Sequence, residues 1–75
     1  MISFDLPTSD DVDVSIYNML GQKVKTFAMY NKSAGTHSVR WNGVNQNNEP
    51  VAAGVYFYQL KTKHYTKMKK MVLVK

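Results

Sequence analysis

The 75-residue chain lacks cysteine and contains two prolines, four glycines and five acidic residues. Without cysteine it cannot form disulfides or thiolate metal sites, so core packing alone must hold the fold. No run of about 18 apolar residues is present, and we therefore expect no segment to span a membrane. A basic stretch followed by an apolar one is also missing from the start, so we expect no intact secretory precursor. The length predicts one domain, residues 1–75.

Charge is distributed unevenly along the chain. Ten Lys and Arg residues against five Asp and Glu residues give a net charge of +5. Four acids lie in the first 13 residues and six bases in the last 15, where no acid is present. These residues are Asp5, Asp10, Asp11 and Asp13, and Lys61, Lys63, Lys67, Lys69, Lys70 and Lys75. The asymmetry indicates either attraction between the two ends or a basic face for an acidic partner.

The apolar residues repeat with a period of two, which is typical of β-strands. The expected strands are Ile2–Leu6, Val12–Tyr17, Lys23–Tyr30, Thr36–Trp41, Val51–Ala53 (a short strand or a corner), Val55–Lys63 and Thr66–Lys75. In the third of these, Val24 and Phe27 are out of phase, which predicts a bulge or an edge strand. No segment has the pattern of a capped amphipathic helix.

About seven short strands with frequent turn signals predict an all-β fold, an immunoglobulin-like antiparallel β-sandwich. The largest rings are expected in its middle, with Trp41 beside Tyr56 or Tyr58. Gly54 fits a corner at which the hydroxyl of Tyr56 bonds back to the main chain.

The titratable residues do not form a catalytic pattern. His37 and His64 lie in different elements without a neighbouring acid in the sequence, so we expect no enzyme and no catalytic residue. Asp10, Asp11 and Asp13 lack the spacing of an EF-hand, and calcium needs about six to eight oxygen ligands. The polar segment 42–49 offers a single carboxylate. We therefore expect no metal and no cofactor.

Nucleic-acid binding is also disfavoured by the pattern. Stacking platforms need aromatic side chains on an exposed face beside a basic groove. Here the alternation directs most aromatic rings inward. The lysines stand singly between apolar residues, which is typical of an edge strand that is protected against aggregation. We expect no nucleic-acid partner.

Several segments in order resemble the type A C-terminal sorting domains of the type IX secretion system of Bacteroidetes and related bacteria. They are "ISFDLP" (2–7), "VDVSIYNMLGQKVKTF" (12–27), "AGTHSVRWNG" (34–43), "VAAGVYFYQL" (51–60) and "KMVLVK" (70–75). The sorting family usually has Asp at the position of Asn42 and a glycine near Asn48, and both departures are between turn-forming residues. A more distant resemblance is to the immunoglobulin-like domain of flagellar hook-capping proteins, which share the frame IYNxxG…WxG…GxYxY.

The first resemblance implies a non-enzymatic C-terminal secretion signal at the end of a larger secreted protein. Its implied partners are the outer-membrane translocon, a sortase-like protease and an N-terminal cargo domain. The protein would reach the cell surface or the medium through the periplasm and the outer membrane. Carried over by position, the partner-recognition residues are Gly54, Tyr56, Lys70, Met71, Val72, Leu73, Val74 and Lys75.

Two other functions stay open at this point. One is a carbohydrate-binding or adhesion module, in which the asparagine-rich segment 42–49 contacts the sugar. The other is an assembly module like the hook cap, in which an exposed strand adds to the sheet of a neighbour. The sequence does not indicate the oligomeric state.

Overall fold

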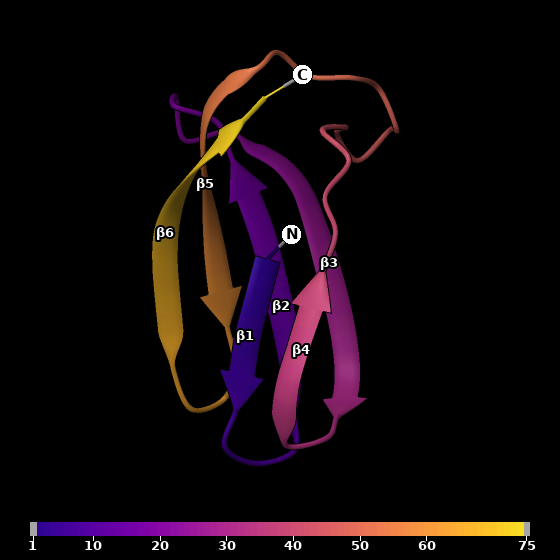
Figure 1. Cartoon of the computed structure of the whole chain (residues 1–75), viewed down its shortest axis with the longest axis vertical. Coiled ribbons are helices and arrows are strands. Elements are labelled where there is room, and N and C mark those ends of the chain that lie inside the picture. Colours follow the sequence, from indigo (N-terminus) through magenta and orange to yellow (C-terminus); the bar gives the residue numbers. More distant parts are fainter. Residues whose placement is uncertain (1, 75) are drawn as a thin grey trace.

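Over the described residues the chain forms six antiparallel strands in two sheets (Figure 1). A computed structural model describes residues 2–74. The strands are β1 (Ile2–Leu6), β2 (Asp10–Tyr17), β3 (Lys23–Lys32), β4 (Gly35–Val39), β5 (Gly54–Lys61) and β6 (Thr66–Leu73). Within the described range, no helix has the length and apolar character needed to cross a membrane.

The two sheets are unequal in size. β1 pairs with β4, and the larger sheet has the order β3-β2-β5-β6. In Figure 1 the β1–β4 pair lies in front of the larger sheet, with the labels of β5 and β6 to its left. The predicted immunoglobulin-like antiparallel sandwich is confirmed, with six strands rather than seven.

The core lies between the two sheets. Because side chains alternate across a strand, every second residue of β1, β2 and β5 points inward. The buried apolar residues are Ile2, Phe4, Leu6, Val12, Val14, Ile16, Tyr56 and Leu60. Two of them in the central strand β2, Val14 and Ile16, have no exposed surface. Complete burial of such a side chain stabilises a fold by about 1.5–3 kcal/mol.

The missing seventh strand is the segment 51–53, which forms the corner rather than the strand. The Val51 N–H donates to the carbonyl oxygen of Gly43 at 3.0 Å, and Val44 forms an isolated bridge with Pro50. Gly54 then enters β5 with φ +141°. Residues with a side chain rarely adopt this conformation, so the position at which the chain leaves the corner and enters β5 favours glycine.

The corner also confirms the expected role of the tyrosine. The hydroxyl of Tyr56 donates to the carbonyl oxygen of Ala52 at 2.6 Å. The ring of Trp41 lies edge-on to that of Tyr56, with centroids 5.0 Å apart. Trp41 is half-buried rather than fully buried. Since β4 ends at Val39, the indole lies beyond the strand, where its N–H donates to the carbonyl oxygen of Val44 at 2.8 Å.

The bulge predicted for the third strand is present, and β3 is an edge strand of its sheet. The register between β2 and β3 shifts between Ile16 and Tyr17, which face Lys25 and Lys23, so Val24 is the additional residue. The expected last strand stops at Leu73, and Lys75 lies outside the described residues.

Candidate docking surfaces

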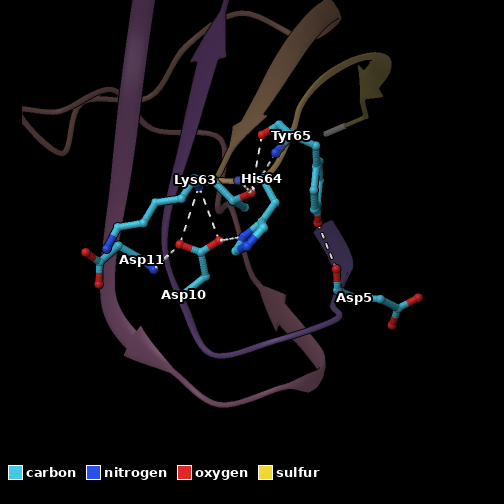
Figure 2. Close-up of polar contacts among 7 residues, drawn as sticks. Asp5, Asp10, Asp11, Lys63, His64 and Tyr65 are labelled. Carbon is cyan, nitrogen blue, oxygen red and sulfur yellow. Dashed lines mark hydrogen bonds and ion pairs between the residues drawn. The ribbon is translucent and has the colours of Figure 1, made fainter.

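A buried carboxylate closes the end of the sandwich at which β2 begins (Figure 2). Asp10 is 7% exposed, and its Oδ2 lies 2.8 Å from Nδ1 of His64. The backbone N–H of Lys63 donates to the same carboxylate at 3.2 Å, and that of Asp11 donates at 2.8 Å. We call these four residues the Asp10 cluster. They tie the first residue of β2 to the turn between β5 and β6.

The contacts of the Asp10 cluster stabilise the ionised carboxylate. The hydrogen bond from His64 lowers the pKa of Asp10 most strongly, and the N–H groups of Lys63 and Asp11 lower it further, against the opposing effect of burial. Asp10 and His64 are 54 residues apart in the sequence, so local inspection missed the pair. Among residues 2–74 no group of three or more His, Cys, Asp or Glu side chains could hold a metal ion. We assign the cluster a structural role.

The outer face of the larger sheet, turned away from the core, carries an apolar surface. Tyr17, Met19, Phe57 and Met68 line a shallow groove on it, and we call these four residues the outer patch. Tyr17 of β2 is opposite Phe57 of β5. Met19 is 72% exposed and Met68 57% exposed, so the patch is open to a partner.

Basic residues border the outer patch. Lys70 of β6 is opposite Phe57, and Lys23 of β3 is opposite Tyr17. Val72 lies two residues beyond Lys70 on the same face and is 63% exposed. The surface therefore has an apolar centre with positive charge beside it.

A second groove runs along the side of the sandwich between β1 and β6. Its first part is lined by β1 residues together with Leu60, Tyr65, Lys67 and Lys69. Its second part is lined by Ile2, Trp41, Met71, Val72 and Leu73. Tyr58 lines both parts, so they adjoin. We call the whole the β1–β6 groove.

The residues predicted to recognise a partner fall into different settings. Gly54 is half-buried at the start of β5, and Tyr56 is buried with its hydroxyl bonded inside the domain. Four of the others, Lys70 to Leu73, lie in β6, and Val74 comes directly after it. Lys70 and Val72 belong to the outer face, Met71 and Leu73 are half-buried against the core, and Val74 is 81% exposed. β6 therefore contributes to both surfaces, whereas Tyr56 supports the fold.

Over residues 2–74 the chain is thus a small antiparallel sandwich of immunoglobulin-like type with two open grooves on its surface. The family model of the FlgD Ig-like domain matches residues 2–65, and the chain belongs to this family. The crystal structure of FlgD from P. aeruginosa is similar, with a TM-score of 0.75 and 26% sequence identity. The match covers 95% of this chain and 56% of that FlgD chain. A comparison with curated proteins gave no match.

The family corrects the assignment to the type IX secretion system. The more distant resemblance, to the hook-capping domain, is confirmed, and the sorting signal is wrong. The translocon, sortase-like protease and cargo expected as partners are wrong with it, as is the location at the cell surface or in the medium. The shared segments consist of turn residues and inward-facing apolar residues. Such residues specify the sandwich and carry little information about its partner.

Proposed function

We propose that this domain is a non-enzymatic assembly module of a hook-capping type of protein, where it contacts protein subunits during flagellar hook assembly. The support is membership of the FlgD Ig-like domain family and similarity to FlgD over 95% of the chain. The chain spans just over half, 56%, of the compared FlgD chain. The proposal accordingly treats the domain as one module of a larger protein.

The outer patch is the observation that carries this proposal. The fold does not need large apolar side chains at Met19 and Met68, because most of their surface is in contact with solvent. Exposed apolar groups surrounded by polar ones mark protein–protein contact sites. Lys23 and Lys70 beside the patch favour a hook subunit whose contact surface has an apolar centre and acidic residues near its edge.

The recognition residues on β6 fit the same proposal. Lys70 and Val72 extend the outer patch along the last strand, which is an edge of its sheet. We propose that these two residues contact the hook subunit together with the patch. Tyr56 would act indirectly, by holding β5 in place through its bond to Ala52.

Contacts inside the asparagine-rich segment favour assembly over carbohydrate binding. Oδ1 of Asn45 accepts hydrogen bonds from the backbone N–H groups of Asn47 at 2.9 Å and Glu49 at 3.0 Å. Its amide nitrogen donates to the carboxylate of Glu49 at 3.3 Å. These polar groups are used to shape the loop and are occupied in the absence of a sugar.

A titration with the monomeric hook subunit of the same bacterium tests the proposal. Met19→Ser and Met68→Ser should each weaken binding by about tenfold, a change typical of an interface contact that matters. Tyr30→Ser is the matched control, since Tyr30 is 73% exposed on β3 and lies outside the patch. Its Kd should equal that of the wild type. Absence of binding by the wild-type domain, or equal Kd values for all variants, would contradict the proposal.

A further inference from the structure

We propose that the β1–β6 groove binds an extended, acidic segment of a partner protein, which adds to the sheet by pairing with β1. This site is distinct from the outer patch and does not depend on the proposed role in hook assembly. It is defined by the free edge of β1, the apolar lining of the groove and two lysines of β6.

The free edge of β1 follows from its hydrogen bonds. β1 pairs with β4 on one side, and its other side has no strand beside it in its sheet (Figure 1). The hydroxyl of Tyr65 donates to the carbonyl oxygen of Asp5 at 2.8 Å, from the turn before β6 (Figure 2). The backbone groups of Asp5 therefore point away from β4. Along an antiparallel strand these directions reverse from each residue to the next. The backbone groups of Ser3, two residues before Asp5, therefore also point away from β4.

These backbone groups offer the contacts that a new strand needs. A peptide that adds to a sheet edge gains affinity from main-chain hydrogen bonds and specificity from pockets for alternate side chains. Ser3 supplies a donor and an acceptor, and Asp5 supplies a donor. Ser3 and Asp5 line the same groove, so a strand paired with them would lie over its floor.

The groove lining favours apolar side chains at one end. Ile2, Trp41, Met71 and Leu73 surround that end, and Tyr58 connects it to the rest of the groove. Met71 is opposite Tyr56 in the register of β5 and β6, and both residues belong to the inner face. A partner residue directed toward this end would therefore meet apolar surface.

Positive charge lines the other end. Lys69 is opposite Tyr58 and Lys67 is opposite Leu60, so both lysines point to the groove side of β6. They are two residues apart, about 6.5–7 Å along the strand. Across residues 2–74 the one ion pair is that of Asp10 with His64, which leaves both lysines without an acidic partner. Asp5 also lines this part of the groove, but among the described residues no salt bridge joins its carboxylate to either lysine, and the carboxylate accepts a hydrogen bond from Thr36 at 2.6 Å.

The chemistry of the bound segment follows from this arrangement. Side chains of an added strand alternate, so two carboxylates at alternate positions would face Lys67 and Lys69. The third side chain on the same side of the segment would be apolar and would contact the end of the β1–β6 groove near Trp41 and Met71. Because β1 has five residues, the segment needs about five to seven residues.

The probe is a capped peptide of about seven residues with the order Thr-Glu-Thr-Glu-Thr-Val-Thr, in which threonine favours the extended conformation. In an NMR titration of the domain, the backbone amide signals of Ser3 and Asp5 should move, while that of Met68 should not. The variant Lys67→Glu/Lys69→Glu should weaken binding by at least about tenfold. Each single variant, Lys67→Glu or Lys69→Glu, is compared with the matched control Lys70→Glu, which reverses one charge on the outer face of the same strand and should leave the Kd nearly unchanged.

Two further measurements test the strand pairing itself. Ser3→Pro removes a donor at the free edge without removing a bond of the β1–β4 ladder, so it should abolish binding. Ser38→Pro is its matched control, since Ser38 is opposite Ser3 and directs its N–H to the other side of β4. A peptide that is N-methylated at the amides expected to bond to β1 should also fail to bind. This test uses the wild-type domain, so it does not depend on whether Ser3→Pro folds.

Several results would overturn the inference. No movement of the Ser3 and Asp5 signals at millimolar peptide would exclude the site. Unchanged binding after methylation of the peptide, or an equal loss in Lys70→Glu, would exclude strand pairing directed by the groove lysines. An unchanged Kd in Lys67→Glu/Lys69→Glu would show that these lysines only protect the edge against aggregation.

Discussion

The two faces of the larger sheet are made by the same strands and differ in what constrains them. On the inner face, Val14 and Ile16 have no exposed surface and pack under β1 and β4. On the outer face, Met68 and Val72 are 57% and 63% exposed, although they alternate with inward residues of the same sheet. The inner apolar residues are explained by folding. We attribute the outer ones to the proposed partner.

Truncation of an inner-face residue should have the largest effect on stability. Ile16→Ala removes a fully buried side chain from the central strand, and such changes cost about 2–5 kcal/mol. A domain of this size has a free energy of unfolding of roughly 4–11 kcal/mol, so the loss should be a large part of the total. Urea unfolding measures it. A loss no greater than that of Met68→Ala would remove the distinction between the two faces.

The entry to β5 should give the next largest effect. Gly54 has φ +141°, while no atom lies within 4 Å of the position that a Cβ would take. Backbone conformation, not lack of space, therefore requires glycine, and Gly54→Val should cost about 1–3 kcal/mol. The exposed neighbour provides the control Ala53→Val, which should change the melting temperature much less. Equal changes at the two positions would show that the glycine is not required.

The end of the sandwich depends on charge rather than on apolar contact. Because folding lowers the pKa of Asp10, its ionised form stabilises the fold above the unfolded-state pKa of about 4. This contribution is lost as the pH falls through the lower pKa of the folded state. The melting temperature of the wild type should therefore exceed that of Asp10→Asn at pH 6, and the difference should shrink below pH 4.

His64→Gln sharpens this test, since the bond from His64 is the largest cause of the lowered pKa. In this variant the pKa of Asp10 should be lowered less, so the acid-dependent part of the stability should be smaller and should be lost over a narrower pH range below the unfolded-state pKa. The variants Asp11→Asn and Lys63→Gln retain the backbone donors and are controls. A constant difference between wild type and Asp10→Asn from pH 2 to pH 6 would contradict the assignment.

An outer-face change should have the smallest effect on stability. Met68→Ser replaces a side chain that is mostly exposed, and surface substitutions usually change stability by no more than about 0.5 kcal/mol. Urea unfolding of the variant should nearly superimpose on that of the wild type. A loss of 2 kcal/mol or more, about the cost of a core truncation, would assign Met68 to the fold instead of to a partner.

The alternation of apolar residues was sufficient to predict the inner face. Ile2, Phe4 and Leu6, together with Val12, Val14 and Ile16, were expected on one side of their strands, and all are buried. The tyrosine corner was also predictable, because a glycine two residues before the ring is a local signal. Local patterns report on local geometry and on which face a residue occupies.

Contacts between distant segments were not predictable in this way. Asp10 and His64 meet because the turn after β5 lies beside the start of β2, and only the topology brings them together. The uneven charge indicated either attraction between the chain ends or a basic face for an acidic partner, without naming a pair. Likewise, the sequence placed Lys70 and Met71 in one recognition segment, whereas strand geometry directs them to opposite faces.

Hook formation in cells tests the central claim, that the outer patch serves assembly. The bacterium lacking the protein that carries this domain is complemented with the wild type, Met19→Ser/Met68→Ser or Tyr30→Ser, and its hooks are counted by electron microscopy. We predict hooks with the wild type and Tyr30→Ser, and few or none with the outer-patch variant at equal protein levels. Normal hooks with the outer-patch variant, or normal hooks in the strain that lacks the protein, would contradict the account.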